Sequence, residues 1–403
     1  MKKTVALLLI LITLLSLFAC GSGEDTTAEN DITSDAPVSD TAQTTEGTNV
    51  PDDTQTDAET EPVTDAEAEP EIIEEPENFT VQRYDFASLS DKVKLIGRAY
   101  TEGTGVVCDM SASGFEFCGY MKGAVRVSIT CTDTVYFSAY VDGERLSSRF
   151  FVSKGTHEIT FATFTEFGFH TVRVVRQTEP ILSQCTFNVL QTACIFGKKP
   201  ADKETYIEFI GDSIISGYGN LCDNTATNAG KPQRQDATQS FPYLTAELLG
   251  SDISVISCSG IGLVKGVHSY TAKDFYAARS YYRGTASYGF DRVPDAVVIN
   301  LGTNDSALGA SEEDFKNGVK ELAEYIRASY KKDVPIIWTY NAMNDERTAP
   351  YLEAEFAALG GEGAGLYLFK LDRNSDGGDL HPSLDAHKTY AEKLSEFIEN
   401  IIK

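Results

Sequence analysis

Four short fragments of the chain carry residue types suited to acyl transfer. They are Gly211–Ile214, Ser259–Gly260, Gly302–Asp305 and Asp379–Pro382, and the first three each follow a short apolar run. Acyl transfer requires an activated nucleophile, a base that accepts its proton, and donors aimed at the developing oxyanion. The fragments contain a serine, a glycine, an asparagine and a histidine, so the sequence predicts a serine-dependent acyl-transfer site.

Ser213 is the candidate nucleophile, because it stands just after the apolar run 206–210 at a predicted strand-to-helix turn. A helix N-cap is the alternative explanation for a serine in this place. No Gly-x-Ser-x-Gly sequence occurs in the chain, which excludes the nucleophile elbow of the α/β-hydrolases.

His381 is the candidate base among the five histidines of the chain. His157 and His170 belong to a segment with strand-like alternation, and His268 lies in a loop. His387 falls on the apolar stripe of the last predicted helix, where packing in the core explains it. His381 lies in a loop just before that helix, so it is the histidine best placed to act on Ser213.

The segment after Pro200 alternates short apolar runs with helical patterns. Ser311 can cap a helix that begins with three acidic residues and has Phe315 and Ile326 on its apolar face, and a final helix starts at Leu384. This alternation predicts a doubly wound parallel sheet over residues 202–403, with ligands beyond the carboxyl ends of its strands. The predicted strands are Tyr206–Ile210, Ile253–Ile256, Ala296–Leu301, Val334–Thr339 and Leu366–Leu371.

Residues 79–198 alternate with a period of two instead. Val125, Val127 and Ile129 are separated by polar residues, and Asp142-Gly143 is typical of a hairpin turn. This pattern predicts an all-β antiparallel sandwich that precedes the α/β domain.

The N-terminus carries a targeting pattern. Lys2 and Lys3 precede an apolar stretch of 14 residues, which is too short for a membrane-spanning helix and typical of a signal peptide. The end of this stretch resembles a bacterial lipobox, so residues 1–20 are predicted to be a lipoprotein signal peptide with lipidation at Cys20. A plain secretory signal is the alternative. We therefore expect a cell-surface or extracytoplasmic lipoprotein that is anchored to the membrane.

Residues 21–78 contain 19 of the chain's 60 acidic residues and none of its 34 Lys and Arg residues. So few large apolar residues cannot offset chain entropy, and the segment is predicted to be a disordered acidic tether. With Lys2 and Lys3 also set aside, the body keeps 41 acidic and 32 basic residues, a net charge of about −9. A mildly acidic body without a basic stripe argues against nucleic-acid binding.

Seven cysteines remain beside Cys20, and no Cys-x-x-Cys occurs. An odd number leaves at least one free thiol, and Cys185 with Cys194 is the pair we consider for a disulfide. Asp372, Asn374, Asp376 and Gly377 match the opening of a calcium loop, but Ser383 stands where a bidentate glutamate is required. No metal is predicted.

Together the four fragments resemble the sequence blocks of the SGNH (GDSL) hydrolases. The resemblance implies a flavodoxin-like sheet and an oxyanion hole made by the N–H groups of Ser213 and Gly260 and the side chain of Asn304. A glycine at 260 lets a backbone donor approach the substrate without a Cβ in the way. No cofactor is expected.

Further motifs are Lys94–Arg98, Gly114–Phe117, Val141–Arg145, Ile210–Ile214 with Gly217–Gly219, and Ser259–Leu263. They resemble carbohydrate esterase family two. This resemblance implies a jelly-roll sandwich before the SGNH domain and a serine esterase that removes O-acetyl groups from xylan or glucomannan through an acetyl-enzyme on Ser213. Among the aromatic residues, Tyr218, Trp338 and Tyr340 are candidates for stacking on sugar rings, with core packing as the alternative.

The partner of His381 departs from the common SGNH pattern, in which the acid stands three residues earlier. Here that residue is Gly378, while Asp379 and Asp376 stand two and five residues before His381. Some members of the esterase family use a backbone carbonyl instead, so we expect the carbonyl of Asp379 to accept the Nδ1 proton, with its carboxylate turned away.

Two other function classes stay open. One is an SGNH acyltransferase or lipase-type hydrolase that acts on envelope polysaccharide or lipid, although polar active-site loops disfavour a long lipid channel. The other is a non-catalytic carbohydrate-binding surface protein. The intact set of Ser213, Gly260, Asn304 and His381 argues against the second.

Overall fold

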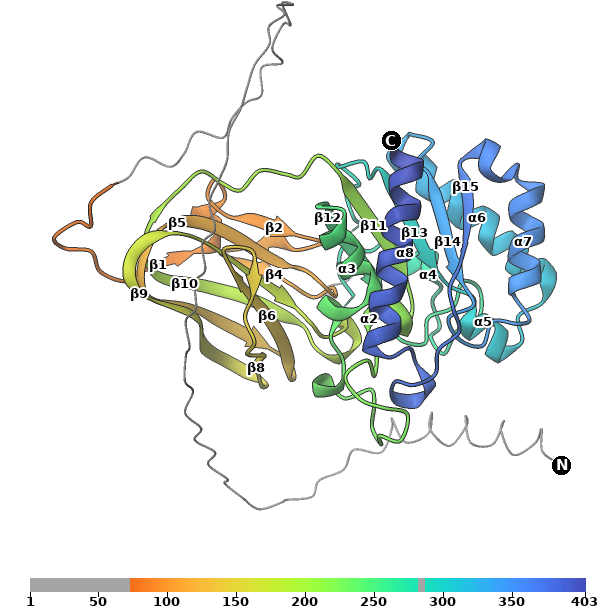
Figure 1. The fold of residues 1–403 in the computed structure, drawn as a ribbon, viewed down its shortest axis with the longest axis horizontal. Coiled ribbons are helices and arrows are strands. Elements are labelled where there is room, and N and C mark those ends of the chain that lie inside the picture. Colours follow the sequence, from red (N-terminus) through yellow and green to blue (C-terminus); the bar gives the residue numbers. More distant parts are fainter. Residues whose placement is uncertain (1–72, 282–286) are drawn as a thin grey trace, which may run out of the picture. The chain divides into compact units, whose positions relative to one another are not determined.

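The computed structural model describes residues 73–281 and 287–403 (Figure 1). The predicted signal peptide, Cys20 and most of the predicted tether lie outside the described residues. An antiparallel β-rich region, strands β1 to β10, precedes an α/β region that runs from β11 to α8. No described helix is both long enough and apolar enough to span a bilayer.

The β-rich region is built around two long strands, β5 and β9, which pair with each other along nearly their whole length. The inward residues Val125, Val127 and Ile129 are fully buried, as the alternation predicted. Neither strand follows a strict period of two, because β5 is interrupted by register shifts on both sides of Gly123 and Ala124. The strands are β1 (Gln82–Asp85), β2 (Lys94–Ile96), β3 (Tyr100–Glu102), β4 (Gly105–Val107), β5 (Gly114–Cys131), β6 (Val135–Val141), β7 (Glu144–Arg145), β8 (Phe150–Val152), β9 (Gly155–Arg176) and β10 (Cys185–Phe196).

The α/β region contains a five-stranded sheet whose strands all run parallel in the order β12-β11-β13-β14-β15. This is the flavodoxin-like order, in which ligands bind where the winding direction reverses, between the first and third strands of the region. The strands are β11 (Tyr206–Gly211), β12 (Asp252–Ser257), β13 (Ala296–Asn300), β14 (Ile336–Tyr340) and β15 (Leu366–Lys370).

Helices cover both faces of this sheet, which confirms the doubly wound prediction (Figure 1). Ile207 and Phe209 pack with α2, α3 and α8 on one face, whereas Ile210 packs with α4, α6 and α7 on the other. Buried on both faces, the strands appear in the sequence as unbroken apolar runs. The helices are α2 (Ser213–Ser216), α3 (Phe241–Leu248), α4 (Ala272–Ala277), α5 (Thr303–Leu308), α6 (Glu312–Tyr330), α7 (Ala349–Ala358) and α8 (Leu384–Ile402).

Charged residues from the β-rich region contact the α/β region directly. The Lys94 ammonium lies 2.7 Å from the Asp252 carboxylate, and the Arg145 guanidinium lies 2.7 Å from Asp236. The innermost pair joins Arg98 to Glu208 of β11 at 3.3 Å, with both side chains fully buried. The Glu208 carboxylate also accepts hydrogen bonds from the hydroxyl groups of Tyr276 (2.5 Å) and Tyr330 (2.9 Å).

The considered pairing of Cys185 with Cys194 is wrong. Both residues lie on β10, nine positions apart, and an extended strand separates them by roughly 30 Å. Cys185 instead stands opposite Cys131 of β5. All seven cysteines of the described residues are free thiols.

Candidate active site

Ser213 is the first residue of α2, at the carboxyl end of β11. The Asp212 carboxylate caps this short helix by accepting the N–H of Ile214 at 3.0 Å, and Gly217 ends it with a φ of 71°. A Cβ on Gly211 would lie 2.6 Å from the carbonyl oxygen of Asn300 on the next strand. The turn that presents Ser213 is therefore tight and packed between the strand, the cap and the core.

His381 faces Ser213 from the loop before α8. Its Nε2 lies 2.8 Å from Ser213 Oγ, and its Nδ1 lies 3.1 Å from the carbonyl oxygen of Asp379. A carbonyl can only accept, so Nδ1 carries the proton and Nε2 presents its lone pair to the serine hydroxyl. Burial lowers the pKa of His381 below its ordinary value, which keeps the ring neutral near pH 7.

The carboxylate of Asp379 points away from the histidine, as the sequence predicted. It accepts a hydrogen bond of 2.8 Å from the hydroxyl of Tyr218, whose ring packs on His381 with centroids 4.5 Å apart. The Asp376 carboxylate accepts from the side chain of Asn374 instead, at 2.8 Å. Gly378 leaves no room for an acid, because a Cβ there would lie 2.6 Å from Cys222 Sγ.

The expected oxyanion donors fall into two groups. Within residues 73–281 and 287–403, the backbone N–H groups of Ser213 and Gly260 have no hydrogen-bond acceptor, so both are available to a substrate. The amide nitrogen of Asn304 is already engaged, 2.9 Å from the carbonyl oxygen of Ile261 and 3.1 Å from Asp212 Oδ2. Asn304 therefore ties the nucleophile turn to the loop after β12, and its role as an oxyanion donor stays a prediction.

Two buried aspartates hold these loops together. Burial raises the pKa of Asp212 to about 7, although its carboxylate accepts the Ile214 N–H. The Asp305 carboxylate accepts three backbone N–H groups, each at 2.8 Å. Both aspartates therefore fasten the loops around Ser213. The three donors are Leu263, Val264 and Lys265.

The aromatic candidates are only partly placed at the site. Trp338 is a correction, because its side chain is fully buried in the core and its Nε1 donates to the carbonyl of Leu301. It stands in the middle of the buried strand β14, and no sugar can reach it. Tyr340 at the end of β14 is half-buried and donates its hydroxyl to Glu353. Tyr218, which covers His381, is the aromatic side chain closest to the reacting groups.

Two other histidines have defined roles in the structure. His387 is fully buried, accepts the N–H of Phe241 at Nδ1, and has its pKa lowered to about 3 by burial, which confirms it as a core residue. His268 was expected only as a loop residue, yet its Nε2 lies 2.8 Å from the carbonyl oxygen of Ser259. The sequence held no local signal for this contact.

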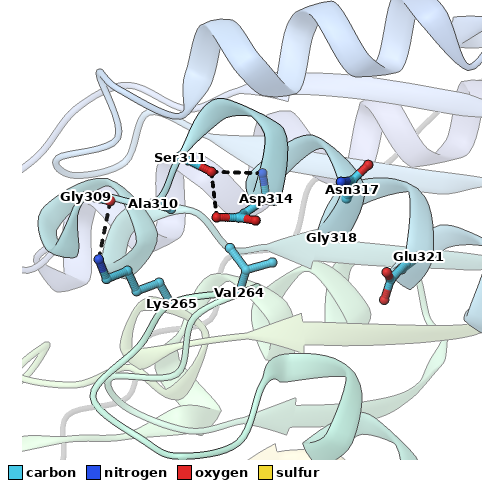
Figure 2. A pocket seen from close by; sticks show the side chains of 9 residues that line it. All are labelled: Val264, Lys265, Gly309, Ala310, Ser311, Asp314, Asn317, Gly318 and Glu321. Carbon is cyan, nitrogen blue, oxygen red and sulfur yellow. Dashed lines mark hydrogen bonds between the residues drawn. The ribbon is translucent and has the colours of Figure 1, made fainter.

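A polar hollow of about 490 Å³ lies beside the loop that Asp305 fastens (Figure 2). Figure 2 shows the Lys265 ammonium directed at the carbonyl of Gly309, and the Ser311 hydroxyl directed at Asp314. Neither Ser213 nor His381 lines this hollow, and neither lines a second one of about 390 Å³ in the β-rich region. These hollows therefore provide no channel that leads an acyl chain to the serine.

Residues 209–389 match the GDSL-like Lipase/Acylhydrolase family. Those residues include Ser213, Gly260, Asn304 and His381, in the geometry described above. The chain contains a GDSL-like lipase/acylhydrolase domain. The GDSL-like domain coincides with the parallel sheet and its helices and does not include the β-rich region.

Similarity to known proteins extends beyond the GDSL-like domain. The chain is 27% identical over 324 residues to the cellulase/esterase CelE of Acetivibrio thermocellus, a match that covers 75% of this chain and 38% of CelE. It is 24% identical over 264 residues to an acetylxylan esterase / glucomannan deacetylase of Cellvibrio japonicus, covering 59% of this chain and 69% of the relative. The match thus spans about two-fifths of the length of CelE.

Among solved structures, the chain is similar to a family two carbohydrate esterase from Clostridium thermocellum in complex with cellohexaose. The two are 27% identical with a TM-score of 0.72, and the match covers 76% of this chain and 98% of that structure. The 76% of this chain that is covered is longer than the α/β region alone, so the likeness includes the β-rich region as well as the GDSL-like domain.

Proposed function

We propose that this chain is a serine esterase that removes O-acetyl groups from plant cell-wall polysaccharides or their oligosaccharides. The observation that carries this proposal is the 2.8 Å contact between Ser213 Oγ and His381 Nε2, with the His381 Nδ1 proton held by the Asp379 carbonyl. The unengaged N–H groups of Ser213 and Gly260 supply donors for an oxyanion.

The reaction follows from this geometry in two halves. Ser213 Oγ attacks the acetyl carbonyl while its proton passes to His381 Nε2, and the negative oxygen is held by the two backbone N–H groups. The C–O bond to the sugar then breaks, and the sugar oxygen takes the proton from His381. In the second half, His381 Nε2 takes a proton from water while the water oxygen attacks the acetyl carbonyl on Ser213. Acetate then leaves, and the Ser213 oxygen takes the proton from His381.

The substrate class rests on the relatives. CelE is named a cellulase/esterase, and the Cellvibrio japonicus relative an acetylxylan esterase / glucomannan deacetylase. Tyr218 and Tyr340 are the aromatic residues that we propose for contact with sugar rings.

We also propose that the mature protein is a lipoprotein anchored through Cys20, with residues 21–78 as an acidic tether and the β-rich region as a jelly-roll sandwich. The basic, apolar and lipobox-like segments of the first 20 residues support the anchor. One acyl chain binds membranes only marginally, so stable anchoring needs at least two. Replacing Cys20 with serine should move the protein from the membrane fraction to the soluble fraction.

Hydrolysis of p-nitrophenyl acetate by the wild type and by Ser213→Ala tests the reaction class. We expect the wild type to hydrolyse p-nitrophenyl acetate and Ser213→Ala to be inactive. The wild type should also release acetate from acetylated xylan or glucomannan. Binding of these polysaccharides without turnover would identify a carbohydrate-binding protein instead. Acetyl transfer to a second sugar in preference to water would identify an acyltransferase.

A further inference from the structure

A glutamate of the β-rich region reaches the loop that carries the Gly260 N–H. Glu179 lies between β9 and β10 and is only 1% exposed. Its Oε2 accepts the backbone N–H of Ser259 at 2.8 Å. Ser259 directly precedes Gly260, so this contact joins the β-rich region to the predicted oxyanion hole.

Glu179 is itself held firmly in place. Its N–H donates to Gln235 Oε1 at 3.0 Å, and its carbonyl oxygen accepts from the Arg176 guanidinium at 2.9 Å. Arg176 is fully buried and also donates to the carbonyl groups of Thr178 and Ser183, each at 2.7 Å. The segment 178–183 is thus folded around one guanidinium, which fixes the backbone of Glu179, and the Glu179 Oε1 atom accepts from Gln235 Nε2 at 3.4 Å.

His268 holds the other side of the same residue. Its Nε2 lies 2.8 Å from the carbonyl oxygen of Ser259, which belongs to the peptide unit that bears the Gly260 N–H. A trans peptide is planar, so its C=O and N–H point in opposite directions. With the carbonyl directed at His268, the Gly260 N–H must point away from that ring.

We propose that Glu179 and His268 are positioning residues that clamp Ser259 and thereby aim the Gly260 N–H at the oxyanion of the reaction. This inference rests on the proposed function and adds a role for the β-rich region in it. Gly260 cannot aim its donor alone, because it has a φ of 80° and glycine samples both signs of φ freely. Burial raises the pKa of Glu179, partly offset by the hydrogen bonds from Ser259.

Glu179→Ala is the decisive variant, with p-nitrophenyl acetate as the substrate. Loss of one oxyanion donor costs about 10²- to 10³-fold in kcat, and a misaimed donor should cost about 10- to 100-fold, with KM within about twofold. The affinity for a small alkylboronic acid, which forms a tetrahedral adduct on serine, should fall by the same factor as kcat/KM. Glu179→Gln should recover most of the activity, because its amide oxygen can still accept the Ser259 N–H.

Glu116→Ala is the matched control. Glu116 also lies in the β-rich region and pairs with Arg173 at 3.0 Å, but it has no contact with residues 257–263 among the described residues. The inference is overturned if Glu179→Ala and Glu116→Ala have equal kcat, or if boronic acid affinity does not change with Glu179. If Glu179→Ala and Glu116→Ala have equal kcat while Ser213→Ala is inactive, only the positioning role is wrong. If Ser213→Ala keeps its activity, the proposed function itself is wrong.

A second pair covers the case in which Glu179→Ala does not fold. His268→Gln places an amide nitrogen within reach of the Ser259 carbonyl, whereas His268→Ala removes the donor. The clamp requires the glutamine variant to be at least about tenfold faster in kcat than the alanine variant. Equal rates for the two variants would contradict it.

Discussion

The predicted nucleophile, Ser213, and its base, His381, are held in place by different kinds of structure. Ser213 follows a central strand, and Asp212, Ile214 and Ile215 around it are almost fully buried. His381 follows an irregular loop in which Asp379 and Leu380 both have positive φ values, and Leu380 is 55% exposed. The nucleophile is positioned by the sheet and its core, whereas the base is positioned by contacts between loops.

The histidine loop is attached mainly to the segment that follows the nucleophile helix. The Gly378 N–H donates to the carbonyl of Gly219 at 3.0 Å, and Tyr218 contacts both Asp379 and the His381 ring. Substitutions around Ser213 and substitutions in the histidine loop should therefore have different effects. Those near Ser213 should affect folding, and those in the histidine loop should affect the alignment of the base.

Ser213→Ala and His381→Ala should have the largest effect, each lowering kcat by about 10⁴-fold or more. The two groups act as one unit, so the double variant should be no slower than the slower single variant. Steady-state kinetics on p-nitrophenyl acetate measures this. A double variant slower by the product of the two single effects would show that the two residues act independently.

Activity should fall about tenfold per pH unit on the acid side of the His381 pKa. Burial lowers that pKa, so the neutral, proton-accepting ring persists to lower pH, and the midpoint of the acid limb of kcat/KM should lie below 6.5. A pH–rate profile between pH 4 and pH 9, with circular dichroism to confirm folding, measures it. A midpoint above 6.5 would mean that a negative charge stabilises the imidazolium.

Asp379→Asn should lower kcat by less than about tenfold, because Asp379 contributes a carbonyl to His381 rather than its carboxylate. Asparagine also tolerates the φ of 51° at this position. Loss of a true triad acid costs about 10⁴-fold. Asp376→Ala is the control and should be near wild type; a loss of 10³-fold or more in either variant would identify a Ser-His-Asp triad.

Tyr218→Phe should have the smallest effect, about threefold in kcat. It keeps the ring on His381 and removes only the hydroxyl that donates to Asp379. Because Asp379 is exposed, this hydrogen bond should contribute about 1 kcal/mol or less to stability, so the midpoint of thermal unfolding should fall by only a few degrees. Asp379→Gly removes the acceptor and tolerates the φ of 51°, so Tyr218→Phe and Asp379→Gly should be non-additive in a double-mutant cycle. Additive effects would mean that this contact does not hold the loop.

Much of the α/β region was predictable because its signals are local. Apolar runs marked the five strands, and Ser311 caps α6 as its sequence indicates. The carbonyl partner of His381 followed from the missing acid at Gly378 together with the resemblance to an esterase family in which some members use a carbonyl. Trp338 was misplaced, since an aromatic residue near the end of an apolar run has the same pattern in a core as in a cleft.

The clamp on Ser259 could not be predicted from the sequence. Glu179 lies 80 positions before its partner, in the other region of the molecule, and nothing in its neighbourhood distinguishes it from a surface glutamate. The full extent of β5 and β9 was missed for a related reason. Register shifts break the alternation near Gly123, so a single long strand has the pattern of several short ones.

The buried ion pair of Arg98 and Glu208 makes the stability of the α/β region depend on the β-rich region. Cutting the chain before β11 would leave Glu208 inside the sheet without its guanidinium, which costs about 3–5 kcal/mol in proteins whose whole stability is about 5–15 kcal/mol. A separated GDSL-like domain would thus be marginal at best. We expect the two regions to unfold in a single calorimetric transition. We also expect them to evolve as one unit, because the GDSL-like domain depends on the β-rich region for its stability.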